Sequence, residues 1–281
     1  MISVADWPLL IGRFSLLTLA IGLFGGACFP LYAPWTPPGR QPASLRVAAP
    51  AAAAAAGLIW LLSLWAQTPG RPSLLQFCLT TVWGGALCVA IALCLVLVAM
   101  AFTPPRSPRV RAYVTGALLV SLAFVGHAAT IGGIAGGVRV AVMALHLLFA
   151  GVWLGGLLPL VIALRTPGAE TEGLLRAFGR MAIGCVAALA TTGLVIAAVV
   201  VSLAGGPPGP PYLITFGVKL ALVLCLGVVA GVNRWALTPL SARNPSAAAR
   251  ALWWTLGVEQ LLALALLVTV AQLGLLDPAA F

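Results

Sequence analysis

The chain has 281 residues, of which 62% are hydrophobic and 7% are charged. A water-soluble domain usually carries about 25% charged residues, so this chain cannot cover itself with a solvated surface. The net charge of +10 does not indicate nucleic-acid binding, because the basic residues stand singly or in small groups between apolar runs, with no interleaved aromatic stripe. The composition therefore excludes a soluble globular protein and favours an integral membrane protein.

Apolar runs recur along the whole chain, and a run of about 20 residues is long enough to cross the hydrocarbon core as a helix. Helices are favoured because lipid offers no hydrogen-bond partners for free backbone groups. We predict an all-α polytopic membrane bundle, a single transmembrane domain over residues 1–281 with about eight transmembrane helices. The spans are expected at roughly 8–31, 46–66, 74–102, 112–130, 138–164, 180–204, 212–234 and 252–275.

The charges of the loops between these spans alternate. The odd-numbered loops carry eleven arginines in or beside them: Arg40, Arg46, Arg106, Arg109, Arg111, Arg165, Arg176, Arg180, Arg234, Arg243 and Arg250. The even-numbered loops carry two, Arg71 and Arg139. Because cytoplasmic loops are enriched in Lys and Arg, the odd loops are predicted to be cytoplasmic and both termini outside, in the periplasm. The N-terminal run is interpreted as the first span, since it lacks the basic start and the cleavage site of a signal peptide.

Three ionisable side chains fall inside predicted spans. Arg13 is near an outer end, where a long side chain reaches the interface. Lys219 and Glu259 lie deeper, and charges at membrane depth usually face a bundle interior or a water-filled cavity. An ion pair between Lys219 and Glu259 is possible on adjacent antiparallel helices, and either residue is a candidate for a transport path or for structural pairing.

The two histidines of the chain, His127 and His146, lie in the outer thirds of the fourth and fifth spans. The short, glycine-rich connection between these spans predicts antiparallel neighbours that bring the two imidazoles together. In the fifth span, Arg139, Met143, His146, Ala150 and Trp153 share one helix face. A thioether one turn from an imidazole is a donor set suited to Cu(I). The alternative interpretation of Met143 is core packing.

Other features of the spans indicate packing. Six cysteines, Cys28, Cys78, Cys88, Cys94, Cys185 and Cys225, all fall within predicted spans without a C-x-x-C pair. They are interpreted as small buried apolar side chains. The small-xxx-small spacing of Gly151 and Gly155 predicts the close approach of another helix.

Several of these residues belong to segments with a characteristic order. The segments are Gly126-His127-Ala128, the stretch HLLFAGVWLGGLLPL from His146 to Leu160, Thr192-Gly193, the stretch FGVKLAL around Lys219, Asn233-Arg234, and Glu259 in the last span. In this order and spacing the chain resembles the CopD (PcoD-like) family of bacterial copper-resistance inner-membrane proteins. The match is clearest from Gly126 to the end.

The resemblance implies a multi-pass protein of the bacterial inner (cytoplasmic) membrane that handles copper. Copper, as Cu(I), would bind transiently on the periplasmic side at His127, His146 and Met143 and be transferred across the membrane for copper homeostasis and resistance. The residues expected along the transport path, or as structural polar groups, are Lys219, Glu259, Asn233, Arg139 and Trp153. A periplasmic copper-binding protein of the CopC type is the implied partner.

The chain departs from the family pattern at two positions. Arg139 and Met143 stand where family members often carry a histidine and an acidic residue. A guanidinium cannot ligate copper and repels a cation. What remains is a leaner Cu(I) site of His127, His146 and Met143, a transit path, or a site that has lost its metal.

Two alternatives remain open from the residues. One is a b-type haem electron carrier, with His127 and His146 as axial ligands. The other is a non-transporting assembly or sensing partner of other copper proteins. No P-loop pattern is present in the sequence, so any transport is not expected to be driven by a nucleotide bound to this chain. No hydrolytic or redox constellation stands out, and we do not expect an enzyme.

Overall fold

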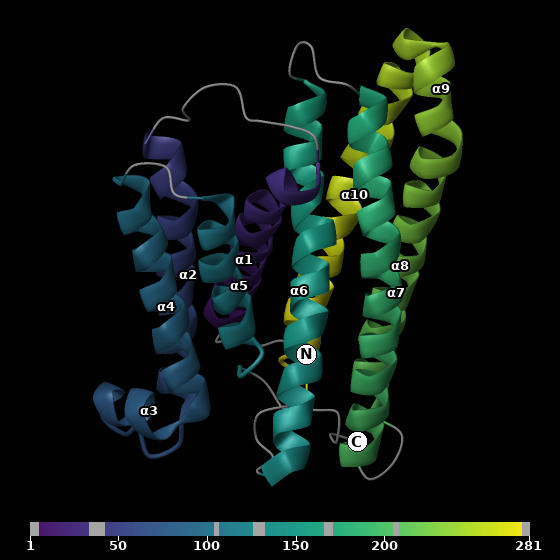
Figure 1. Ribbon diagram of the computed structural model, residues 1–281. Helices are drawn as coiled ribbons and strands as arrows, with labels where there is room; N and C mark the ends of the chain where they lie inside the picture. The colour runs from purple at the N-terminus through teal and green to yellow at the C-terminus, as the bar shows by residue number, and fades with distance from the viewer. Residues whose placement is uncertain are drawn as a thin grey trace.

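The computed structural model describes residues 6–33, 43–103, 107–125, 133–165, 171–204 and 208–276. Within these ranges the regular structure is helical, and Figure 1 shows the long helices running side by side as a bundle. Seven of the described helices are long and apolar enough to cross a membrane. The expected fold class, an all-α polytopic membrane bundle, is confirmed.

The helices follow one another along the chain with short connections. They are α1 (Trp7–Tyr32), α2 (Ala43–Gln67), α3 (Leu74–Thr80), α4 (Val82–Ala101), α5 (Pro108–Leu122), α6 (Gly133–Leu164), α7 (Thr171–Ala204), α8 (Pro210–Val232), the π-helix η3 (Asn233–Leu237), α9 (Thr238–Arg243) and α10 (Pro245–Leu273). All the long helices except α5 are candidate membrane spans.

The third expected span, 74–102, is divided into two helices at Thr81. This residue has extended backbone angles, φ −105° and ψ 139°, and its hydroxyl accepts a hydrogen bond from Gly84 N at 3.0 Å. Thr81 therefore ends α3 and caps the N-terminus of α4. Gly84 allows the tight turn, because a β carbon there would lie 2.6 Å from the Phe77 carbonyl oxygen. The expectation of one continuous helix was wrong because a capping threonine is inconspicuous in an apolar run.

The fourth expected span, 112–130, corresponds to the shorter helix α5. Ser107 caps its N-terminus, and the helix ends at Leu122 in a turn over 123–125. With 15 residues, α5 is shorter than the helices that qualify as membrane spans. It nevertheless packs inside the bundle, against α1, α4 and α6. Residues 126–130 lie outside the described part of the chain.

The centre of the bundle is the crossing of α1 and α6, far apart in the chain. Gly25 of α1 and Gly155 of α6 meet backbone to backbone, and a β carbon on either would collide with the other helix. A β carbon at Gly151 would lie 2.7 Å from both Leu119 and Phe24. The small-xxx-small spacing therefore does allow close helix approach, as the sequence indicated.

The last helices surround this centre more loosely. α7 packs on α6, α8 packs on α10, and α10 packs on α1, whereas α7 and α8 hardly touch each other. Figure 1 shows α2 and α4 on one side of the bundle and α7 and α8 on the other, with α6 between them. Arg13 Nη1 donates to the Gly274 carbonyl oxygen at 2.8 Å, which joins the start of α1 to the end of α10. That this end faces the periplasm stays a prediction from the loop charges.

Candidate metal site between the central helices

His146 lies on the side of α6 that contacts α7, where a threonine holds its ring. Nδ1 of His146 is 2.8 Å from Thr192 Oγ1. The next residue of α7, Gly193, also faces the ring, since a β carbon there would lie in ordinary van der Waals contact with His146 Cε1, at 3.6 Å. The Thr192-Gly193 pair therefore forms a seat for the half-buried imidazole.

The hydrogen bonds of Thr192 assign the tautomer of His146. Thr192 Oγ1 donates to the carbonyl oxygen of Ala188, one turn earlier in α7, at 2.7 Å. A threonine hydroxyl has one hydrogen and two lone pairs, so towards the imidazole it acts as the acceptor. This arrangement favours the tautomer of His146 that carries its proton on Nδ1 and keeps the lone pair of Nε2, which is the form that ligates a metal ion.

Lys219 of α8 brings a positive charge near this ring. The side chain is half-buried, and its ammonium group is close enough to the His146 imidazole to interact with it electrostatically. A charged Lys219 opposes a cation at Nε2, whereas removal of that charge favours it. The structure thereby brings His146 and Lys219, which lie on separate spans, close enough for an electrostatic interaction.

The remaining expected ligands are placed differently. Met143 is half-buried and packs with Val120 and Ala123 beside the end of α5. It therefore contacts α5, whereas His146 contacts α7. His127 lies outside the described residues. Arg139 is half-buried one turn before Met143, and its Nη1 is buried without a hydrogen-bond partner in the described part of the chain.

A second polar group lies where α8 becomes a π-helix. Asn233 is 8% exposed and Glu259 of α10 is 4% exposed. The Glu259 carboxyl is within reach of the Asn233 amide, yet neither Oδ1 nor Nδ2 of Asn233 meets hydrogen-bond geometry among the described residues. Thr238 Oγ1 donates to the Asn233 carbonyl oxygen at 2.8 Å across the π-turn. Single π-turns of this kind are frequent at functional sites.

The possible ion pair between Lys219 and Glu259 is not formed. Glu259 is level with Asn233, which follows Lys219 by 14 residues, and a rise of 1.5 Å per residue separates the two levels of α8 by about 21 Å. The physical reason is the helix register. α8 continues through η3 and α9 to Arg243 instead of ending near 234, so its later part lies beside the middle of α10.

Trp153, the last of the expected path residues, is 4% exposed and belongs to the apolar core of the bundle. Its indole is two turns along α6 from His146, where the helix packs against α1. Thr192 was not among the expected site residues, although it belongs to a segment of the family resemblance. A threonine paired with a histidine across two helices leaves no local sequence signal.

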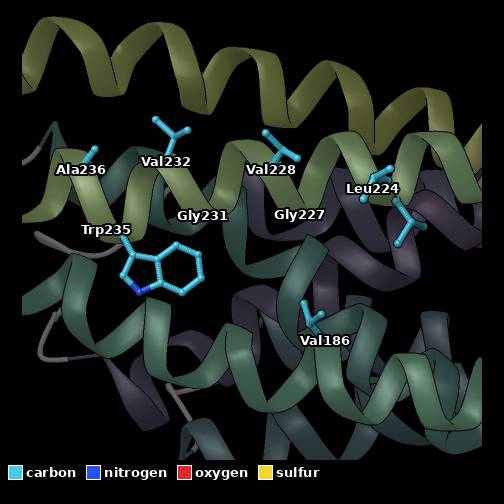
Figure 2. Close-up of a pocket in the computed structure, with 9 residues that line it drawn as sticks. Val186, Leu224, Gly227, Val228, Gly231, Val232, Trp235 and Ala236 are labelled. Atoms are coloured by element: carbon cyan, nitrogen blue, oxygen red, sulfur yellow. The ribbon is translucent and has the colours of Figure 1, made fainter.

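An open groove of about 740 Å³ lies between α7 and α8. Figure 2 shows Trp235 projecting from η3 into this space, with Val186 on the facing helix α7. The other lining residues are aliphatic or glycine, among them Leu224 and Val228. The groove therefore offers no metal ligand of its own, and the polar chemistry of the described residues lies elsewhere.

The chain matches two family models. Residues 172–273 match the model described as copper resistance protein D, and residues 4–138 match that of the copper resistance protein D-like N-terminal domain. The chain is also 29% identical over 226 residues to the inner membrane protein YebZ of Escherichia coli (strain K12), covering 74% of this chain and 73% of YebZ. No solved structure matches. The seat of His146, the Lys219 segment and the Asn233–Glu259 pair all lie within or beside the matched helices.

Proposed function

Since the chain belongs to the copper resistance protein D family and is a multi-pass protein of the bacterial inner membrane, we propose that it binds copper near the periplasmic side of the bundle and transfers it across the membrane. Copper is the cargo, carried as Cu(I). A periplasmic copper-binding protein of the CopC type would deliver it. The family supports a role in copper resistance, and the chemistry of the described residues supports the finer mechanism.

The observation that carries the proposal is the hydrogen bond between His146 and Thr192, at 2.8 Å. It holds the orientation of the ring and favours the tautomer in which Nε2 is unprotonated, as hydrogen-bond partners of metal-binding histidines usually do. Any buried histidine needs a hydrogen-bond partner, so the support for a metal site lies in which ring nitrogen the partner occupies: Thr192 bonds Nδ1, and Nε2 remains available.

Lys219 gives this site the property of a transit site. Transport requires that an ion bind well enough to enter and weakly enough to leave. A positive charge beside His146 shortens the residence of Cu(I) at the ring. In the proposed mechanism Met143 and His127 receive the ion on the outer side, and Lys219 promotes its release inward.

Asn233 and Glu259 form a second polar site on the proposed path, deeper in the membrane. Their side chains are buried together, and a carboxylate with an unpaired amide stabilises a passing cation that the surrounding lipid-facing helices do not. The place of Asn233 at the start of the π-turn, with its amide buried beside the Glu259 carboxyl, supports this role, because single π-turns are frequent at functional sites.

The test replaces His146 with alanine and measures Cu(I) affinity of the purified full-length protein and copper accumulation in cells that express it. We expect loss of the outer-site affinity and a change in accumulation, at unchanged protein level. Leu145→Ala is the matched control, because Leu145 precedes His146 on the same helix and its side chain is 47% exposed.

Unchanged copper affinity and accumulation in the His146→Ala variant would overturn the proposed site. Lost affinity with unchanged accumulation would support the non-transporting partner function instead. The absorption spectrum of the same preparation tests the haem carrier: a Soret band that disappears in the His146→Ala variant would identify a haem ligand in place of a copper ligand.

A further inference from the structure

Three sulfur-containing side chains from two helices lie in the same part of the bundle. Met181 and Cys185 lie one turn apart on α7, with Cys185 Sγ 3.4 Å from Met181 Sδ. The thiol of Cys28 on α1 is close enough to Cys185 for charges on the two to interact. Cys185 is 5% exposed, and Cys28 and Met181 are half-buried. α1 and α7 are brought together here across α6.

The contacts around these sulfurs leave a polar group unsatisfied. Tyr32, one turn after Cys28, turns its hydroxyl towards Gly156 of α6, where a β carbon would lie 2.7 Å from it. This hydroxyl is buried and has no hydrogen-bond partner among the described residues, and it is near enough to both thiols to interact electrostatically. Apolar packing alone would favour phenylalanine at this position, because phenylalanine has no hydroxyl group that requires a hydrogen-bond partner.

The donor set suits one class of ligand. Thiolate and thioether sulfurs are soft donors that select soft ions such as Cu(I) over Mg²⁺ or Ca²⁺. Three sulfurs that ligate one ion at about 2.3 Å in a trigonal plane lie about 4.0 Å apart. The present separation of 3.4 Å between Cys185 and Met181 needs only a small opening to reach that value.

We propose that Cys28, Met181 and Cys185 form a second binding site for Cu(I), between α1 and α7, with the Tyr32 hydroxyl donating a hydrogen bond to a bound thiolate. On binding, Cu(I) forms bonds to the two thiolates and the thioether. The two thiol protons leave to solvent, and no electron is transferred.

The position of this sulfur site extends the path that begins at His146. Cys185 precedes Thr192 by seven residues on α7, which places it on the same helix face and about 10 Å away along the axis. The sulfur site is therefore the next soft donor set that an ion leaving the seat of His146 would meet. Its place on a transport path rests on the proposed function, whereas its capacity to bind Cu(I) does not.

The experiment measures the number of Cu(I) ions held by the purified full-length protein in detergent under reducing conditions, in competition with a chromophoric Cu(I) chelator. The variants are Cys28→Ala, Cys185→Ala and the volume-conserving Met181→Leu. Cys94→Ala is the matched control, because Cys94 is fully buried in α4 outside the sulfur site. Each preparation is checked for thermal stability, and thiolate-to-copper absorption in the ultraviolet reports ligation directly.

We expect Cys28→Ala and Cys185→Ala each to lose one Cu(I) per chain together with the thiolate absorption, and Met181→Leu to weaken that ion at least about tenfold. Cys94→Ala should keep the ion. Unchanged stoichiometry in a folded Cys185→Ala protein would overturn the proposal, as would an equal loss in Cys94→Ala. The same titration on His146→Ala separates the two sites, because the sulfur-bound ion should remain there even if the proposed outer site fails.

Discussion

The two sides of this bundle are packed to very different degrees. Of the residues in the most apolar stretch of α6, 50% are buried against the rest of the protein. In the corresponding stretches of α7 and α8 the share is 6%. α1, α2, α4, α5 and α6 contact one another closely, while α7 and α8 stand apart with a groove between them. The first group is a packed core, and the second is largely exposed to lipid.

Individual polar side chains on the two sides can be compared in the same way. In the packed core, the buried hydroxyls of Thr115 and Ser121 donate to carbonyl oxygens of their own helix, at 2.8 and 2.7 Å. On the loosely packed side, Thr192 holds a histidine of another helix, and the amide of Asn233 has no partner among the described residues. Thr115 and Ser121 are therefore satisfied within their own helix, whereas Thr192 reaches across to another helix; Tyr32 of α1 is an exception in the core, since its hydroxyl is buried without a partner among the described residues.

The largest effect should come from filling the closest contact of the core. Gly155→Val places side-chain atoms against the Ile21 carbonyl and Gly25, so the α1–α6 crossing must open. We expect destabilisation of about 3 kcal/mol or more and a strong loss of folded protein. Gly227→Val is the control, because a β carbon there meets nothing within 4 Å. Thermal unfolding in detergent gives the comparison, and equal effects at the two glycines would contradict the difference in packing.

Removing the seat of His146 should change copper affinity more than stability. Thr192→Val keeps the shape of the side chain but leaves Nδ1 without its partner. We expect Cu(I) affinity at the outer site to fall about 10–100-fold, with a stability change of about 1 kcal/mol. Thr191→Val is the matched control, since Thr191 is exposed and bonds only within α7. Identical affinities in the two variants would show that Thr192 does not orient the ring.

The buried pair on the loosely packed side should be dispensable for stability. The double change Asn233→Leu with Glu259→Met replaces both polar groups by apolar ones, which is often neutral or stabilising by about 1 kcal/mol. Thr115→Val in the packed core should instead lower stability by about 1 kcal/mol, because it deletes a made hydrogen bond. If the double variant keeps full copper accumulation in cells, Asn233 and Glu259 are not on the path.

The smallest effect is expected at the groove. Val228→Ala truncates a side chain that is 60% exposed, so stability should change by no more than about 0.5 kcal/mol. Leu118→Ala, at a fully buried position of α5, should cost about 2–5 kcal/mol. Chemical unfolding of the two variants in the same detergent measures the two losses of stability. A loss at Val228 comparable to that at Leu118 would mean that the groove is filled by protein or by a tightly bound molecule.

The fold class could be predicted from the sequence because long apolar runs admit few structures in lipid. The close contact of α6 was likewise visible in the spacing of Gly151 and Gly155. The division at Thr81 and the π-turn at Asn233 were not, because each depends on a single hydrogen bond that competes with a regular helix.

The candidate site was predictable only in part. His146 and Lys219 stood out as rare polar residues in apolar spans, but the seat at Thr192 depends on how two helices face each other. Lys219 was the expected partner of Glu259, but Asn233 lies beside it instead, because α8 continues further than the sequence indicated. The proximity of Cys28 on α1 to Cys185 on α7 depends on how three helices pack, and no local pattern encodes it.

The contact of Gly25 with Gly155 has a consequence for how this protein can evolve. Neighbouring residues in most cores drift together, because a larger side chain on one helix is offset by a smaller one on the other. Here both partners already carry the smallest side chain, so neither can shrink to accommodate growth of the other. The two positions should therefore be individually intolerant in a mutational scan and silent in analyses of covariation, although they form the tightest contact between their helices.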